Sequence, residues 1–208
     1  MSVLVIFMES AFERTARLLL IEPKKQWTGV ELSHRTGYSR AMMSRILKQL
    51  EQEVVVAKPY KNRFVMVEPI RLLMLWSSKR KLPSPVYVRS RKSEEDLDGT
   101  IARMKDVALT LFRGAWLRTQ YMKTSSYELY VDPERIDQVV RRIGRISRAP
   151  ERISLFPADD PSVFLGSQRT RGLPAVSLPQ NFVDLMSIGG SGPRVALQMG
   201  TATGLLGV

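Results

Sequence analysis

The chain has 208 residues, which suits one large or two small domains, and its apolar content of 44% is ordinary for a protein with a packed core. It contains no cysteine and one histidine, His34, which excludes disulfides, thiol catalysis and thiolate metal ligands and argues against a zinc site. The formal net charge is +12 and is unevenly spread: residues 1–81 hold 15 Lys and Arg against 7 Asp and Glu, whereas residues 82–208 hold 17 against 13. A basic N-terminal part favours a polyanionic partner.

The first elements expected along the chain are a short apolar run and a helix. The run Val3–Met8 is too short to span a membrane and has no basic residues before it, so we expect neither a membrane segment nor a targeting signal, and predict a cytoplasmic protein. From Glu9 to Glu22 apolar residues recur at helical spacing, which predicts an amphipathic helix. Pro23 ends it, because proline cannot continue the helical hydrogen bonds.

Residues 28–53 carry the signals of two helices joined by a tight turn. Thr28 is a suitable N-cap, and Glu31 three residues later completes a capping box. Gly37 suits the left-handed position that closes a helix, and Ser39 caps the longer helix that follows. The apolar residues of this second helix share one face and are Met43, Ile46, Leu47 and Leu50. A short helix, a glycine turn and a basic helix form the helix-turn-helix pattern, in which the second helix presents its N-terminal residues to the major groove.

Two strands joined by a basic turn are expected next. Val54–Lys58 and Arg63–Val67 favour strands, Pro59–Asn62 favours a turn, and a helix follows over Pro69–Lys81 with proline at its first position. The stretch "ELSHRTGYSRAMMSRILKQLEQE", with this hairpin after it, resembles the winged helix-turn-helix domains of prokaryotic transcription regulators. The resemblance implies a DNA-binding domain over residues 1–81. A structural or protein-binding use of the same domain stays open.

The candidate DNA-binding residues lie at the second helix and at the hairpin. Arg40 and Arg45 can each bind a guanine edge through two hydrogen bonds, and Met42 can contact a thymine methyl group or pack in the core. The hydroxyl, amide and lysine side chains are expected to contact phosphates and to set the register on the duplex. The complete set is Thr28, Ser39, Arg40, Met42, Ser44, Arg45, Lys48, Lys58, Lys61, Asn62 and Arg63.

Residues 82–93 are rich in proline, serine and basic residues and are expected to form a linker, although Val86–Arg89 could be a short strand. After them, Asp96–Thr100 read "DLDGT", which matches the nucleophile motif of haloacid-dehalogenase phosphatases. That chemistry requires an apolar strand before the motif, but "RSRKSEE" precedes it. We therefore expect a helix start, with Ser93 as N-cap and carboxylates in the first turn.

Residues 94–208 alternate between helical and strand patterns, which predicts an α+β domain. Helices are expected over 94–105, 114–121, 133–147, 179–190 and 192–202. Strands are expected over 107–112, 127–132, 151–159, 162–166 and 175–179. The predicted fold class is therefore α+β, with an N-terminal winged helix-turn-helix domain followed by a C-terminal α+β domain.

No stretch of the second domain makes a convincing active site. "GGSG" at Gly189–Gly192 follows a helix and favours a helix–helix turn over a phosphate loop. "LGSQRTRG" at Leu165–Gly172 begins like a nucleotidyltransferase motif, but the next strand has no acidic pair to hold Mg²⁺. Asp159 and Asp160 precede Pro161 and fit a turn. We expect no catalytic residue, metal or cofactor. An enzyme of the phosphatase or nucleotidyltransferase kind with an appended winged helix is the alternative.

Three stretches of the second domain carry a further resemblance: "VALTLFRGAWLRTQYMKTSSYELYVDPERI", "ISLFPADDPSVF" and "LPAVSLPQNFVDLMSIGGSGPRVALQM". Together with the first domain they resemble the AbiEi-like antitoxins of type IV toxin–antitoxin systems over roughly residues 10–200. The resemblance implies a sequence-specific regulator that binds double-stranded DNA and represses its own operon. It also implies a cognate toxin as a partner, and a homodimer is a further candidate. A protein–protein adaptor that uses its winged helix without DNA is the remaining alternative.

Overall fold

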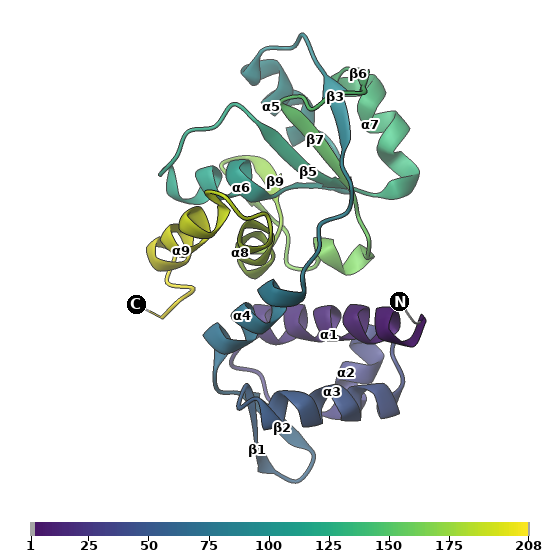
Figure 1. Cartoon of the computed structure of the whole chain (residues 1–208), viewed down its shortest axis with the longest axis vertical. Coiled ribbons are helices and arrows are strands. Elements are labelled where there is room, and N and C mark those ends of the chain that lie inside the picture. The colour runs from purple at the N-terminus through teal and green to yellow at the C-terminus, as the bar shows by residue number, and fades with distance from the viewer. Residues whose placement is uncertain (1–2, 208) are drawn as a thin grey trace. The chain divides into compact units, whose positions relative to one another are not determined.

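The computed structural model describes the backbone of residues 3–207 and the side chains of residues 10–207 (Figure 1). The chain divides into two compact units, which we call unit 1, Met1–Lys79, and unit 2, Arg80–Val208. Both helices and sheets are present, so the predicted α+β class is confirmed.

Unit 1 contains four helices and a hairpin in its described part. In chain order the elements are α1 (Val3–Ile21), α2 (Gly29–Thr36), α3 (Arg40–Gln52), β1 (Val56–Tyr60), β2 (Arg63–Met66) and α4 (Pro69–Lys79). The strands β1 and β2 pair antiparallel, and an isolated bridge connects Trp27, two residues before α2, to Phe64 of the hairpin. The hairpin is thus held against the start of α2 by backbone hydrogen bonds.

Local signals set the boundaries of α2 and α3. The Thr28 hydroxyl accepts a hydrogen bond from the amide of Glu31, and the Ser39 hydroxyl accepts one from the amide of Met42. Gly37, with φ of 76°, closes α2 in the left-handed region that favours glycine. The expected N-caps and the glycine turn are confirmed. The face of α3 that is buried also matches the expectation: Met43, Ile46, Leu47 and Leu50.

Unit 2 is built on a seven-stranded mixed sheet. Its elements are β3 (Val86–Arg89), α5 (Glu94–Ala102), β4 (Val107–Leu109), α6 (Leu111–Thr119), β5 (Tyr127–Val131), η1 (Pro133–Arg135), α7 (Ile136–Ile143), β6 (Arg145–Ser147), β7 (Ile153–Pro157), η2 (Pro161–Phe164), β8 (Gln168–Thr170), β9 (Leu173–Ala175), α8 (Leu178–Ser187) and α9 (Gly192–Ala202). The strand order is β6-β3-β7-β5-β4-β9-β8. The pairs β5–β7 and β4–β9 are parallel and the other pairs are antiparallel.

The central strand β5 is buried along its whole length, as strands covered on both faces are. On one face Tyr127, Leu129 and Val131 join an apolar cluster that α5 and α7 complete through residues such as Leu97 and Val140. On alternate positions Glu128 and Tyr130 point to the other face, because successive side chains of a strand alternate. The side chain of Tyr130 there reaches Asp184 of α8.

Several boundaries differ from the sequence-based expectation. The segment 82–93 is not a free linker, because Val86–Arg89 form β3 and pair with both β6 and β7. The strand expected over 162–166 is instead the 3-10 turn η2, in which the Asp160 carboxylate accepts the amide of Ser162. The strand expected over 107–112 ends at Leu109, and α6 begins at Leu111. Strands β6 and β8 were not expected.

This arrangement makes a specific prediction for limited proteolysis. Residues 81–85 have neither helix nor strand and Lys81 is exposed, whereas Arg89 lies in a strand that is paired on both sides. Trypsin cleaves most readily where the backbone is exposed and is not hydrogen-bonded in a helix or sheet. Brief trypsin treatment should therefore cut first after Lys81. Mass spectrometry of the fragments measures this, and Lys81→Gln should slow the first cut. A first cut after Arg89 would contradict the observed pairing of β3.

No helix in residues 3–207 combines the length and the apolar character needed to cross a bilayer.

Candidate nucleic-acid interface

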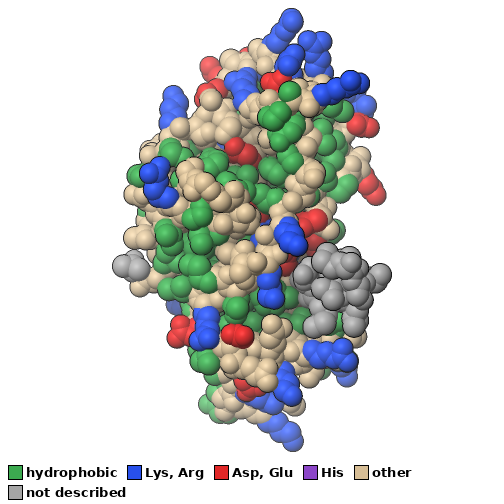
Figure 2. Space-filling model, in the orientation of Figure 1, with side chains coloured by type: hydrophobic (Ala, Val, Ile, Leu, Met, Phe, Trp, Pro, Cys, Tyr) green, Lys and Arg blue, Asp and Glu red, His purple; other side chains and the backbone are tan. Residues whose placement is uncertain are grey.

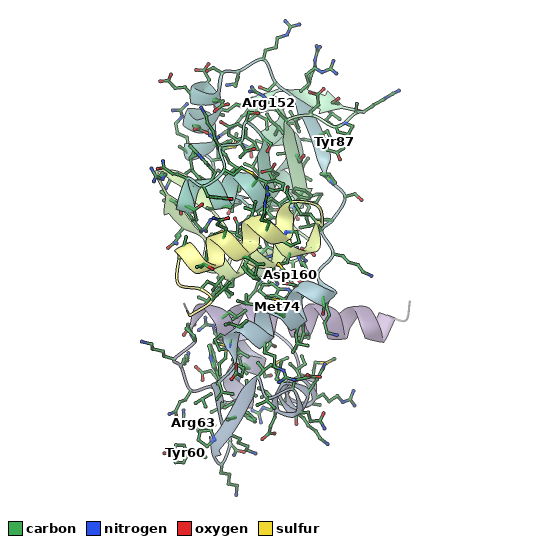
Figure 3. All side chains as sticks on the ribbon, turned by 60° about the vertical axis from the view of Figure 1, so that its left-hand side comes forward. Tyr60, Arg63, Met74, Tyr87, Arg152 and Asp160 are labelled. Carbon is green, nitrogen blue, oxygen red and sulfur yellow. The ribbon has the colours of Figure 1, made fainter. Side chains whose placement is uncertain are left out.

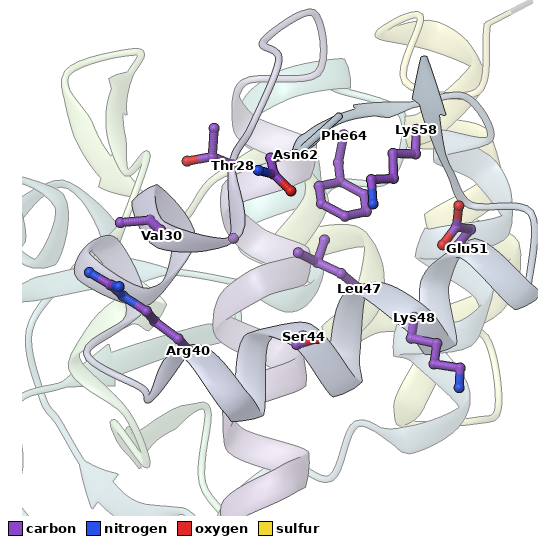
Figure 4. A pocket seen from close by; sticks show the side chains of 11 residues that line it. Thr28, Val30, Arg40, Ser44, Leu47, Lys48, Glu51, Lys58, Asn62 and Phe64 are labelled. Carbon is purple, nitrogen blue, oxygen red and sulfur yellow. The ribbon is translucent and has the colours of Figure 1, made fainter. Parts of the chain in front are cut away.

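The start of α2, the outer side of α3 and the hairpin enclose a groove with a cavity volume of about 700 Å³, which we call the hairpin groove (Figure 4). Its walls are formed by Thr28, Gly29, Val30, Arg40, Ser44, Leu47, Lys48, Glu51, Lys58, Asn62 and Phe64. Six of these were expected from the sequence as DNA-binding residues: Thr28, Arg40, Ser44, Lys48, Lys58 and Asn62. The fold therefore brings residues from three separate segments around one hollow.

The remaining candidates lie outside the lining of this groove: Ser39, Met42, Arg45, Lys61 and Arg63. Arg40 and Arg45 differ by five positions, which turns them about 140° apart around the helix axis. Arg40, Ser44 and Lys48 follow each other at intervals of four and share the groove side of α3. Arg45 is exposed on another side of the same helix, so the two arginines cannot contact the same base pair step in the same way.

Two of the candidate hydroxyl groups already have a local role. The amide of Glu31 donates to Thr28 Oγ1 at 3.1 Å, and the amide of Met42 donates to Ser39 Oγ at 3.2 Å. Each hydroxyl accepts one hydrogen bond as a helix cap and keeps its own proton for donation. Thr28 and Ser39 thus fix the helix ends first, and any phosphate contact would add to that role.

The basic side chains of α3 and the hairpin are not neutralised by carboxylates. Within residues 10–207, none of the following six forms an ion pair: Arg40, Arg45, Lys48, Lys58, Lys61 and Arg63. All six are exposed. Lys58 lies 5.5 Å over the ring of Phe64, which positions its ammonium group at the groove without removing its charge.

Several basic residues elsewhere in unit 1 are paired with carboxylates, although within residues 10–207 Lys24 and Lys79 form no ion pair. Lys25 pairs with Glu31 at 2.7 Å and with Glu22 at 3.4 Å, and Arg35 pairs with Glu22 at 3.1 Å. The carboxylate of Glu31 raises the pKa of Lys25, and the ammonium of Lys25 in turn lowers the pKa of Glu31. Uncompensated positive charge in unit 1 is therefore concentrated at α3 and the hairpin.

Sequence reasoning missed two features of this surface. Glu51 is the one carboxylate in the lining of the groove, and its helical spacing from Arg40, Ser44 and Lys48 would have revealed it. A carboxylate there repels phosphates but can accept a hydrogen bond from cytosine N4. The second feature is Tyr60, which is 67% exposed next to the turn of the hairpin, close to Arg63 (Figure 3).

The turn of the hairpin has its own conformational requirement. Asn62 has φ of 63°, in the left-handed region that asparagine tolerates better than most residues. Asn62 therefore shapes the turn as well as lining the groove, and this places Lys61 and Arg63 on the exposed end of the hairpin.

Unit 2 holds a buried ionic cluster around Asp184, whose side chain is 0% exposed. Its Oδ1 accepts hydrogen bonds from Arg80 Nε at 3.2 Å, from Tyr130 OH at 3.0 Å and from Gln180 Nε2 at 2.8 Å. Its Oδ2 accepts one from Thr110 Oγ1 at 2.7 Å. Burial raises the pKa of Tyr130, so its phenol remains a donor. Both carboxylate oxygens are satisfied within the protein, which fits a structural role better than a catalytic one.

A second ionic cluster surrounds Arg113, whose side chain is 1% exposed. Its Nη2 donates to both carboxylate oxygens of Asp98 at 2.8 Å, and also to the hydroxyl of Tyr127 at 2.9 Å. Burial raises the pKa of Tyr127 and also that of the nearby Glu128. The Glu128 carboxylate accepts a hydrogen bond from the backbone amide of Arg113 at 3.2 Å. These contacts join α5, α6 and β5.

The "DLDGT" stretch lies inside α5 and not at the end of a strand. Ser93 caps this helix by accepting the amide of Asp96, as expected, and donates its own proton to the Asp96 carboxylate at 2.7 Å. Asp98 is held by Arg113. The two aspartates are thus engaged in helix capping and in an ion pair. Among the side chains of residues 10–207, no group of His, Cys, Asp or Glu is arranged to hold a metal ion.

Comparisons with protein-family models, with curated proteins and with solved structures gave no significant match to this chain.

Proposed function

We propose that this chain is a sequence-specific regulator that binds double-stranded DNA, and that unit 1 is a winged helix-turn-helix domain with α3 as its recognition helix and the hairpin as its wing. The order of elements in unit 1 supports this proposal, since α2, the turn at Gly37 and α3 are followed by the paired strands β1 and β2. The observation that carries it is the set of six unpaired, exposed basic side chains on α3 and the hairpin.

The proposal divides these side chains by chemistry. Arg40 and Arg45, from the N-terminal half of α3, bind base edges in the major groove, where the guanidinium fork matches guanine O6 and N7. Lys61 and Arg63 at the exposed end of the hairpin bind phosphates, and such contacts do not read the sequence. Glu51 keeps phosphates away from its end of the hairpin groove and favours a cytosine there.

The role of unit 2 within this proposal rests on the loose resemblance to the AbiEi-like antitoxins. We propose that the chain represses its own operon and that unit 2 provides the antitoxin function, with a cognate toxin or a second copy of the chain as its partner. The buried clusters around Asp184 and Arg113 then serve the stability of unit 2, and the proposal includes no catalytic step. The chain would act in the cytoplasm.

Binding to duplex DNA at two or more salt concentrations tests the proposal. Wild-type protein should bind DNA from upstream of its own gene more tightly than random DNA. Arg40→Ala or Arg45→Ala should each cost about 1–3 kcal/mol on the upstream site and relax the preference at one base position. Lys61→Ala should weaken binding to both DNAs and reduce the slope of log K against log salt by about 0.9. Fluorescence anisotropy measures each quantity.

The control for this experiment is Lys24→Ala, which removes one exposed lysine of unit 1 away from α3 and the hairpin. It should leave the preference for the upstream site unchanged and alter the salt slope less than Lys61→Ala does. Two results would contradict the DNA-binding proposal and favour the adaptor alternative. One is a wild-type affinity that does not depend on salt concentration, and the other is wild-type affinity in all three interface variants.

A further inference from the structure

A second basic hollow lies in unit 2, remote in sequence from α3 and the hairpin. Its cavity volume is about 640 Å³, and we call it the arginine hollow. Its walls are formed by Arg89, Arg91, Lys92, Asp96, Arg141, Arg142, Ile143, Gly144 and Arg145. Six of these nine residues are cations and one is a carboxylate, and the cations come from β3, from the loop after it, from α7 and from β6. Figure 2 shows Lys and Arg side chains projecting from the end of unit 2 where Figure 1 places α5, β6 and α7.

The fold forces like charges together at this hollow. Arg89 and Arg145 are directly opposite each other on the antiparallel strands β3 and β6, an arrangement that destabilises a strand pair when both residues carry the same charge. The close approach depends on Gly144, because a Cβ atom at that position would lie 2.2 Å from the carbonyl oxygen of Arg89. The backbone is therefore built to bring these two arginines side by side.

Only part of this charge is compensated inside the protein. Arg89 pairs with Glu151 at 2.7 Å and lowers the pKa of that carboxyl. Within residues 10–207, no ion pair is formed by Arg91, Arg141, Arg142 or Arg145. Arg141 and Arg142 also lie in the last turn of α7, where a positive charge suits the helix dipole, but that explanation does not extend to Arg91 or Arg145.

We propose that the arginine hollow binds a compact polyphosphate anion, such as the di- or triphosphate group of a small molecule. Guanidinium groups match phosphate oxygens through paired hydrogen bonds, and several of them around one hollow suit an anion with several charges in a small space. The volume lies in the range of small-ligand pockets. The lining contains no aromatic side chain on which a nucleic-acid base could stack, which argues against a single-stranded nucleic acid.

Tripolyphosphate is a suitable probe, with full-length protein and calorimetry at constant ionic strength. Wild-type protein should bind it, and Arg141→Gln/Arg145→Gln should weaken binding roughly tenfold or more, because each arginine removes charge-assisted hydrogen bonds. The matched control is Lys123→Gln/Arg194→Gln, which removes two exposed cations of unit 2 outside the hollow and should bind as the wild type does. Circular dichroism should show that both variants keep the wild-type fold, since all four side chains are exposed.

A further variant separates this inference from the proposed function. Arg40→Ala/Arg45→Ala changes α3 only and should leave tripolyphosphate binding unchanged, whether or not unit 1 binds DNA. If the control or the α3 variant lost as much affinity for tripolyphosphate as Arg141→Gln/Arg145→Gln does, the probe would be binding to basic surface in general, and the inference would be overturned. No binding by the wild-type protein would also overturn it. Displacement of tripolyphosphate by a 12-base-pair duplex or by a poly-glutamate peptide at lower concentration would also overturn it, in favour of a macromolecular partner.

Discussion

Arg80→Ala is expected to lower the free energy of unfolding of unit 2 by about 3–5 kcal/mol, the cost of removing one partner from a buried ion pair. The Arg80 side chain is 1% exposed and that of Asp184 is 0% exposed. Without the guanidinium, the Asp184 carboxylate stays buried but keeps only neutral donors, from Tyr130, Gln180 and Thr110. Three neutral hydrogen bonds do not replace the lost opposite charge around a carboxylate that is 0% exposed.

Hydrogen exchange resolved by mass spectrometry measures this effect unit by unit in the full-length protein. Protection of the β5 and α8 amides should fall by roughly two to four orders of magnitude, since each 1.36 kcal/mol is a factor of ten. Amides of α3 should not change. Asp159→Asn is the matched control: its carboxylate also binds Arg80 at 2.7 Å, but its side chain is 37% exposed, so its loss should cost about 1 kcal/mol or less. Equal effects of the two variants would show that burial of the pair does not matter.

The same glycine-to-alanine change should have opposite effects in two helices of unit 2. In α6, a Cβ atom at Gly114 would lie 1.9 Å from Oδ1 of the buried Asn181 and 3.3 Å from the carbonyl oxygen of Leu109. Gly114→Ala should therefore destabilise unit 2 by about 1–3 kcal/mol, the usual cost of overpacking a core. In α5, a Cβ atom at Gly99 would have only the tip of Arg103 within 4 Å, at 3.8 Å. Gly99→Ala should stabilise by about 0.5–1 kcal/mol, because alanine suits a helix interior better than glycine.

Urea denaturation followed by circular dichroism gives both values as shifts of the midpoint. The paired design separates the space around each residue from its helix propensity, since propensity favours alanine at both positions. If Gly114→Ala were neutral, the contact between α6 and α8 at Asn181 would have to be looser than the structure shows.

Elements with their own local signals were predicted well from the sequence. The starts of α2, α3 and α5 follow from Thr28, Ser39 and Ser93, each of which caps its helix by accepting a hydrogen bond from the amide three residues later. Such contacts are complete within one turn, so they need no knowledge of the fold. The apolar face of α3 was predictable for the same reason, because helical spacing alone selects it.

Elements defined by their neighbours were missed. Strands β6 and β8 are three residues long and largely exposed. They form because their backbones hydrogen-bond to the neighbouring strands β3 and β9. Their sequences, "RIS" and "QRT", are too short to show the alternation over four to eight residues that predicts a strand. The strand β3 was considered, but its proline-rich surroundings favoured a linker.

Six of the eleven candidate residues line the hairpin groove, but the electrostatics of this surface could not be predicted. The sequence identified the basic residues of α3 and the hairpin, yet it could not show that Lys25 is paired with Glu31 while Lys58 has no carboxylate partner. Which cations are neutralised depends on segments that meet only after folding. For the same reason the sequence could not show that the side chains of Arg80 and Arg113 are each only 1% exposed, which is rare for arginine.

The location of Arg80 also determines where the chain can be divided into separate pieces. Composition suggested a boundary at residue 82, yet a fragment that begins there would leave out the cation that compensates Asp184. Such a fragment would contain every strand and helix of the seven-stranded sheet unit and still carry an uncompensated carboxylate in its interior. The autonomy of this part of the protein thus depends on one residue at its very beginning, two positions before the region that looks like a linker.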